Sequence, residues 1–356
     1  MHQNGIATRQ LGFPNNHQAA SPPGSKPPYS APTASLGGVP SHLPDIPISA
    51  VLIGLFACSA ATHLFFFQRN LRRRPGGYKF IFSFLLFVFS CTRIAALSLR
   101  VKWATVPTDA NIALAATVLT SAGVLILFIV NLVLARRVIR GLHPRFGWSK
   151  GVDWGFKGLI VTVVGTLIMV VVCSVHSMFT LDAVARGRER NVLLFAGVYM
   201  AVVAFLPAVT VTVAKLVPNT GPHPSEGFGK GALTTKAALL VFTSLFLTLG
   251  AGFRAGVNFA PTPKDQPQWY HSKPAFYCFN FAIELLVVYT YAIFRFDQRF
   301  HVPVGSSEPG HYSGARQIKG QDAQELDDRD AGSGGSAITE DLREKDGVGR
   351  HGRSAV

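Results

Sequence analysis

Seven long apolar runs alternate with short polar loops along the chain, and both ends of the chain are polar. The runs cover residues 46–67, 80–99, 110–135, 158–181, 192–214, 232–253 and 275–294. A helix of about 20 apolar residues spans the ~30 Å hydrocarbon layer of a bilayer, and lipid requires that backbone polar groups be paired within the protein. The pattern therefore predicts an all-α membrane protein, with a seven-transmembrane helix bundle over residues 46–302.

The two ends lack any apolar period. Residues 1–45 are rich in Pro, Ser, Gly and Asn, and residues 303–356 in Gly, Ser and charged residues. Such segments bury too little apolar surface to offset the entropy of ordering. We predict a disordered extracellular tail over 1–45 and a disordered cytosolic tail over 303–356. Phe alternates with Arg over 294–301, which favours a segment lying along the inner membrane surface.

The basic residues of the loops predict the orientation. The first, third and fifth loops carry about twice as many Lys and Arg as the second, fourth and sixth. Such residues accumulate on the cytosolic side. We therefore expect the N-terminus outside and the C-terminus in the cytosol, in the plasma membrane rather than an endomembrane.

Composition agrees with this assignment. The 356 residues are 48% hydrophobic and 15% charged, whereas a soluble domain carries roughly 25% charged residues. The formal charge of +15 could indicate nucleic acid, but the basic residues flank the apolar runs. We expect the lipid bilayer as a partner, and no nucleic acid. The cysteines all fall within the runs, so we expect small, buried, unpaired side chains; they are Cys58, Cys91, Cys173 and Cys278.

The last run contains a carboxylate near its middle. Glu284 is too deep and too short to reach the headgroups, and a charge at that depth is costly unless it is paired or faces a polar interior. Tyr277, Asn280, Glu284 and Tyr291 recur at helical spacing on one face. Glu284 therefore either pairs with Arg93 or Arg254 as a structural lock, or faces a water-filled pocket.

Other polar residues fall in the outer half of the predicted bundle. Arg93 could also extend to the outer headgroups, His176 could be a hydrogen-bonded packing residue, and Tyr199 could belong to an interfacial aromatic belt. We predict a ligand-binding site formed by Arg93, His176, Tyr199, Tyr277, Asn280 and Glu284. The GxxxG pattern of Gly252 and Gly256 predicts close helix packing within the bundle.

Enzyme signatures are absent from the sequence. An intramembrane zinc hydrolase needs three His or carboxylate ligands around one point, but His63 and His176 lie near opposite sides of the membrane. There is no G-x-S-x-G and no Gly-rich phosphate loop. The last run also lacks the central lysine of microbial retinal proteins. We expect no enzyme activity, no metal and no cofactor.

The stretches 80–100 (FIFSFLLFVFSCTRIAALSLR) and 277–303 (YCFNFAIELLVVYTYAIFRFDQRFHVP) resemble a fungal family of uncharacterised seven-helix membrane proteins. Some of its members carry a family-C-like G-protein-coupled receptor label. The resemblance covers approximately residues 44–303. The 45-residue N-terminal tail cannot be the large extracellular ligand domain of a genuine family C receptor, and the motifs of rhodopsin-like receptors are missing.

Three functions remain open from the sequence. The first is a receptor-like sensor with a small-molecule or lipid ligand in the outer half, coupled to a cytosolic signalling partner through the third loop and C-terminal tail. The second is a transporter or lipid-handling protein, which should show polar residues continuing through the membrane. The third is a non-catalytic structural membrane protein.

Overall fold

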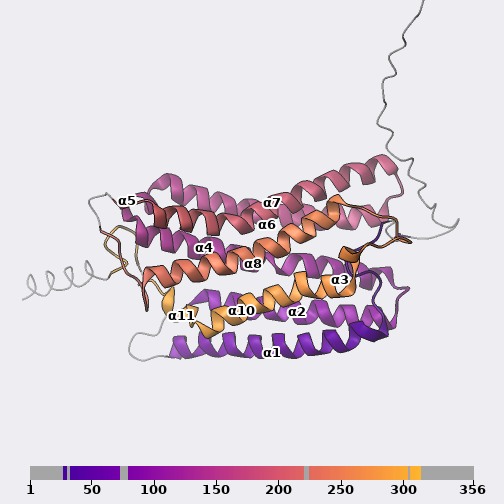
Figure 1. Ribbon diagram of the computed structural model, residues 1–356, viewed down its shortest axis with the longest axis horizontal. Helices are drawn as coiled ribbons and strands as arrows, with labels where there is room; N and C mark the ends of the chain where they lie inside the picture. The colour runs from indigo at the N-terminus through magenta and orange to yellow at the C-terminus, as the bar shows by residue number, and fades with distance from the viewer. Residues whose placement is uncertain (1–26, 30–32, 73–78, 220–223, 304, 314–356) are drawn as a thin grey trace, which may run out of the picture.

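The computed structural model describes residues 27–29, 33–72, 79–219, 224–303 and 305–313, and it is a bundle of long helices (Figure 1). Within these residues, seven helices are long and apolar enough to cross a membrane, which confirms the predicted fold class. The chain is an integral membrane protein. The spans are α1 (His42–Arg72), α2 (Ile81–Thr105), α3 with α4 (Ala110–Leu142), α6 (Lys150–Phe179), α7 (Ala183–Leu216), α8 (Leu233–Phe259) and a last span over Lys273–Ile293.

Two of the spans are interrupted along their length, in addition to the kink at Leu43 near the start of α1. The third is divided into α3 (Ala110–Gly123) and α4 (Leu125–Leu142) at Val124. The last consists of α9 (Lys273–Tyr277), the π-helix η2 (Cys278–Ala282) and α10 (Ile283–Ile293). Neither irregularity is predicted from the apolar pattern, and both lie beside the polar site described below.

Several spans begin at a residue that caps the helix. The Asp109 carboxylate accepts hydrogen bonds from the backbone N–H groups of Asn111 and Ile112, and Asp182 does the same for α7. Ser149 caps α6. Such caps satisfy backbone donors that have no partner inside the helix.

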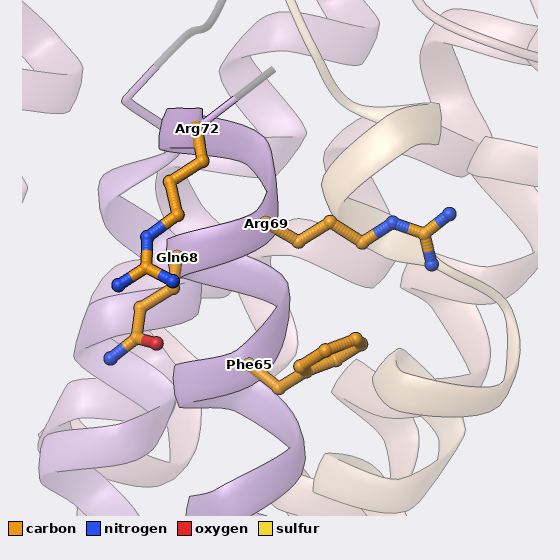
Figure 2. Close-up of a pocket in the computed structure, with 4 residues that line it drawn as sticks. All are labelled: Phe65, Gln68, Arg69 and Arg72. Carbon is orange, nitrogen blue, oxygen red and sulfur yellow. The ribbon is translucent and has the colours of Figure 1, made fainter.

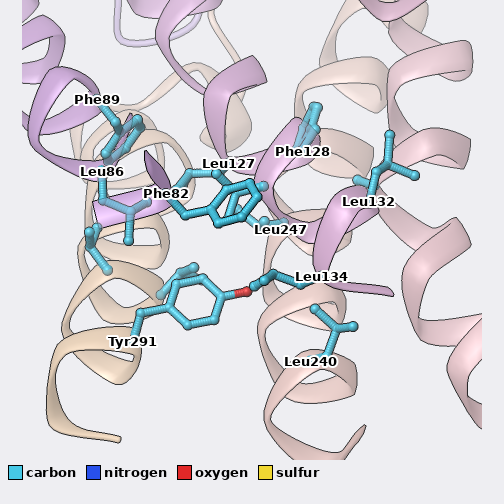
Figure 3. Close-up of a cluster of buried hydrophobic side chains, with 14 of the residues drawn as sticks. Phe82, Leu86, Phe89, Leu127, Phe128, Leu132, Leu134, Leu240, Leu247 and Tyr291 are labelled. Carbon is cyan, nitrogen blue, oxygen red and sulfur yellow. The ribbon is translucent and has the colours of Figure 1, made fainter. Parts of the chain in front are cut away.

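Helix α4 lies at the centre of the bundle. It packs against α7, α8, α6 and α2, while α1 packs on α2 and α7 on α8. Its side chains Leu127, Leu132 and Leu134 are buried, together with Leu86 of α2 and Leu247 of α8 (Figure 3). By contrast α6 buries little of its surface, so most of α6 faces the lipid.

The ends of the bundle are more ordered than predicted. Helix α1 begins at His42 rather than at residue 46. Before it, Gly37 adopts φ +77 and lies against the Phe276 side chain. A Cβ atom at this position would lie 2.6 Å from the Phe276 Cγ. The prediction of a disordered tail up to residue 45 is therefore wrong for this last part, whereas residues 1–26 lie outside the described residues.

The segment after the last span turns back onto the protein. Arg295 has φ 48, and the short helix α11 (Phe296–Arg299) follows it with Phe296 and Phe300 buried. This contradicts the expectation of a segment lying on the membrane surface. Tyr312 is also buried, against Trp148 and Phe228, and this burial raises the pKa of its hydroxyl. The predicted cytosolic tail is thus ordered at its start, and residues 314–356 lie outside the described part.

Two packing expectations are wrong. Cys58, Cys91 and Cys278 are exposed on the helix surfaces rather than buried, although none forms a disulfide within the described residues. Gly252 and Gly256 face open space, so the GxxxG pattern does not mediate close packing here. The close approach is made by Gly250 instead, where a Cβ would lie 2.9 Å from the Phe279 carbonyl oxygen.

Candidate functional site

Arg93 of α2 and Glu284 of α10 form an ion pair inside the bundle. The Arg93 Nη2 donates to Glu284 Oε1 at 2.7 Å, and Nε lies 2.5 Å from Oε2. Both side chains are buried, with exposed fractions of 0% and 1%. The predicted pairing is therefore confirmed, and the alternative in which Arg93 extends to the headgroups is wrong.

A second guanidinium shares the same carboxylate. Arg254 Nη1 of α8 lies 3.6 Å from Glu284 Oε1 and donates to Asn280 Oδ1 at 3.3 Å. Asn280 in turn donates to the Phe276 carbonyl at 2.9 Å. Two cations thus meet one buried anion, so this group of residues carries a net positive charge. We call Arg93, Arg254, Asn280 and Glu284 the outer-half cluster.

The surroundings hold Arg93 in place. Its guanidinium lies between the rings of Phe89 and Phe281, at 5.3 and 5.6 Å from their centroids. Its Nη1 donates to the Thr120 carbonyl at 2.6 Å. At Gly123, where α3 ends, a Cβ atom would lie 3.1 Å from the Arg93 Cζ. The break between α3 and α4 therefore gives the guanidinium room and a carbonyl partner.

The π-helix η2, called the π-turn below, directs the polar residues of the last span toward different neighbours. A π-turn holds one residue more than an α-turn, and one residue corresponds to about 100° of rotation. Tyr277, before the turn, bonds to Ser49 and Asp45 of α1, whereas Glu284, after it, points at Arg93 and Arg254. π-turns occur frequently at functional sites.

A second charged group lies nearer the end of the bundle at which α1 begins, the predicted outer end. Asp45 is fully buried and lies 2.9 Å from Arg100 Nη2 and 2.6 Å from Lys273 Nζ. Arg100 also donates to the Gly37 carbonyl at 2.9 Å, and its guanidinium lies 4.0 Å from the centroid of the Phe276 ring. This group ties α1, α2 and the last span together.

Polar contacts continue in the predicted cytosolic half. The Tyr291 hydroxyl bonds to Asn131 of α4 and lies 3.0 Å from Thr243 Oγ1 of α8. Asn131 also donates to Ser244 at 3.0 Å. Figure 3 shows the Tyr291 hydroxyl pointing from α10 toward the helices that carry Leu134 and Leu240. His63 Nε2 of α1 lies 3.3 Å from the Val288 carbonyl.

Two of the predicted site residues lie elsewhere. His176 of α6 pairs with Glu189 of α7, and its side chain is 60% exposed. Tyr199 of α7 bonds to Thr162 and stacks on Phe195. Both belong to the α6–α7 pair, so the structure does not join them to the outer-half cluster. Arg93, Asn280 and Glu284 are brought together, and Tyr277 belongs to the Asp45 group.

Sequence reasoning missed Asp45, Arg100 and Lys273, because charges at the ends of apolar runs were assigned to loops and tails. A signal was present, however. Arg93 and Arg100 are seven residues apart, as are Tyr277 and Glu284. Residues seven apart lie near one another on a helix face, so the two pairs predict two levels of contact between α2 and the last span.

Comparison with known proteins adds one finding. Residues 229–301 match a family described as a protein of unknown function (DUF3112). The matched region runs from just before α8 through α11, and it includes Arg254, Asn280 and Glu284 but not Arg93. No curated protein and no solved structure matches the chain.

Proposed function

We propose that this integral membrane protein is a receptor-like sensor without enzyme activity, whose ligand acts on the outer-half cluster. The observation that carries the proposal is the sharing of one buried carboxylate, Glu284, by Arg93 and Arg254. Buried charges are costly unless they are fully compensated. A cluster with an excess positive charge gains from an additional anion, and this is the reason for placing the ligand there.

The charge indicates the class of ligand. A metal cation or an amine would be repelled by the two guanidiniums, whereas a small carboxylate or another compact anion could pair with the second one. Arg254 is the accessible member, with 21% of its side chain exposed against 0% for Arg93. The ligand would therefore reach Arg254 first and draw it away from Glu284 and Asn280.

The surrounding helices offer a route by which such a change could be transmitted. Glu284 and Tyr291 both lie on α10, about 10 Å apart along the axis at the ~1.5 Å rise per residue. Tyr291 contacts Asn131 and Thr243, which lie on α4 and α8. A shift of α10 or α8 would thus alter contacts in the cytosolic half, and the π-turn and the α3–α4 break are places where the helices can adjust. A sensor needs an element with two arrangements that its ligand can bias.

The proposal is tested with the purified full-length chain in detergent. Thermal unfolding is measured with a panel of small carboxylates, inorganic phosphate and, as the opposite charge class, small amines. We expect one or more of the anions to raise the melting temperature of the wild type, and not of the Arg254→Gln variant. A panel in which no compound acts, or in which amines act as well as anions, would contradict the proposal.

A transporter is the second candidate, and one observation favours it. Polar residues continue from the outer-half cluster to Asn131, Tyr291 and His63, whereas the sequence indicates a cytosolic half poor in polar groups. Proteoliposomes decide between the two functions, because a transporter would move a stabilising anion, or protons, across the membrane at a rate that depends on Glu284. A sensor would bind the anion without flux.

A structural role is the third candidate, and the near-complete burial of Arg93 and Glu284 favours it. In that case the ion pair would only fasten α2 to α10. Neither stabilisation by an anion nor flux would then be observed, although Glu284→Gln would still destabilise the protein.

A further inference from the structure

A basic cavity lies at the opposite end of the bundle from the outer-half cluster. It is an open hollow with a volume of about 340 Å³. Four segments line it: the last turns of α4, the residue after the short helix α5 (Pro144–Gly147), the first turn of α6, and the segment after α11. The lining residues are Arg136, Arg140, Trp148, Lys150, Asp153, Trp154, Ser306 and Ser307.

The cavity has more cations than anions. Asp153 is its single carboxylate, and it contacts Arg136, Arg140 at 2.9 Å and Lys157 at 2.7 Å. Three cations therefore share one anion, while Lys150 lines the same space. The Nε of Arg136 is buried without a hydrogen-bond partner. Within these residues the positive charge and the donors are in excess.

The geometry suits a phosphate group. Two arginines at one site can present several N–H donors to phosphate oxygens. The guanidinium of Arg140 lies 3.9 Å from the centroid of the Trp148 ring, which holds its plane in a fixed orientation. The first turn of the 30-residue helix α6 adds the positive end of a helix dipole. The hydroxyl groups of Ser306 and Ser307 complete the lining from the far side.

The position of the cavity favours a lipid as the source of the phosphate. Lys150, Asp153 and Trp154 all belong to the first turns of a membrane span, so the cavity lies at the level of the headgroups. Trp154 is 73% exposed beside it, and Trp is enriched at the membrane interface. Basic pockets between transmembrane helices on the cytosolic side accommodate phosphorylated headgroups. We propose that this cavity binds the phosphomonoester headgroup of an anionic membrane phospholipid.

Occupation of the cavity would also fasten the segment after α11. Ser306 and Ser307 line the cavity, and a few residues later the backbone N–H groups of Gly310 and Tyr312 donate to the Glu226 carboxylate, at 2.5 and 3.1 Å. A bound phosphate would add a second attachment point to this segment. Binding of the lipid would then stabilise the ordered conformation of the segment after α11, which leads into the C-terminal region.

The test compares nanodiscs of phosphatidylcholine that contain either phosphatidylinositol 4,5-bisphosphate or phosphatidylserine, at matched total lipid charge. Native mass spectrometry of the full-length chain counts the phospholipids that stay bound. We expect the number of phosphoinositide molecules bound to the wild type to exceed the number of phosphatidylserine molecules by one. Lys150→Gln removes a lining cation while it leaves the Asp153 ion pairs in place, and we expect it to weaken retention about fivefold. Arg136→Gln/Arg140→Gln should abolish the preference.

A matched control removes two charges from the same side of the membrane. Arg69 and Arg72 lie near the end of α1 beside a smaller hollow of about 300 Å³, and Figure 2 shows their guanidiniums pointing in different directions. In this arrangement the two guanidiniums do not converge on one point. Arg69→Gln/Arg72→Gln should therefore keep the preference for the phosphoinositide.

Two results would overturn the proposal. Equal losses in the Arg69/Arg72 and Arg136/Arg140 variants would mean general attraction of a basic surface to anionic lipid. Soluble inositol 1,4,5-trisphosphate that binds the detergent-solubilised wild type as tightly as the lipid, with the same loss in Lys150→Gln, would mean that the site takes a free phosphate and not a membrane lipid.

Discussion

Arg93 and Arg100 lie seven residues apart on α2, and each guanidinium is buried against a carboxylate of a different helix. Arg93 pairs with Glu284 of α10, and Arg100 pairs with Asp45 of α1. The same face of α2 thus connects the first and last spans at two depths. Because the driving force for helix association in lipid is weak, these two ion pairs make a large contribution to how the three helices are aligned.

The ion pair between Arg93 and Glu284 should appear as a strong energetic coupling. We expect Glu284→Gln to lower the free energy of unfolding by about 3–5 kcal/mol, since it leaves two guanidiniums without a carboxylate. Arg93→Gln should also destabilise the protein but cost less, because Arg254 still lies 3.6 Å from Glu284. The double variant should lose less than the sum of the two. Unfolding in mixed detergent micelles measures all three, and strict additivity would exclude direct pairing.

The loss of stability in Arg254→Gln can be compared with the losses in the Arg93 and Glu284 variants. Arg254 lies 3.6 Å from Glu284, farther than Arg93 does, so its attraction to the carboxylate is weaker. We expect Arg254→Gln to cost less than Arg93→Gln. The reverse order would show that Arg254 is the principal partner of Glu284.

The space beside the Arg93 guanidinium should not accept an additional carbon. Gly123→Ala places a Cβ about 3 Å from the Thr92 hydroxyl and from Arg93 Cζ, so the guanidinium must move and its bonds to Glu284 and Thr120 lengthen. We expect a loss of about 1–3 kcal/mol. Gly165→Ala in α6 is the matched control, because nothing lies within 4 Å of its Cβ position. There alanine should be neutral or stabilising by up to about 1 kcal/mol, and similar values for both variants would contradict the geometry.

The segment after α11 should depend on Glu226. Its carboxylate accepts the N–H groups of Gly310 and Tyr312, and a hydrogen bond to a charged group contributes about 1.5–3 kcal/mol. Glu226→Ala should therefore accelerate amide hydrogen exchange of residues 305–313 by roughly tenfold or more. Ser225→Ala, at the exposed neighbouring position, should leave it unchanged. Unaltered exchange in Glu226→Ala would mean that Tyr312 packing alone holds the segment.

The orientation remains a prediction from the loop charges. Tags at the two ends of the chain, exposed to protease in sealed inside-out vesicles, should be cut at the C-terminus and protected at the N-terminus. Protection of the C-terminal tag would reverse the sides assigned to the outer-half cluster and to the basic cavity.

The apolar runs predicted the number and order of the spans, because length and hydropathy are local properties of the sequence. Helical spacing likewise placed Glu284 on a buried face, and opposite charge at a similar depth suggested Arg93 as its partner. The contributions of Asp45 and Arg100 were not predicted, since part of their surroundings comes from the segment before α1, where Gly37 contacts Arg100 and Ser41 contacts Asp45. His176 and Tyr199 were grouped with the site by depth alone, and depth does not tell which helices are neighbours.

The π-turn has a consequence for how related sequences should vary. A helix that contains such a turn is one residue longer than the plain helix that would cover the same rise. Relatives that lack it should therefore show a single-residue deletion between positions 278 and 282. In such relatives position 250 should no longer need to be glycine, because Gly250 makes room for the Phe279 carbonyl that the π-turn displaces. An alignment gap in one span and a larger side chain in another would thus occur together.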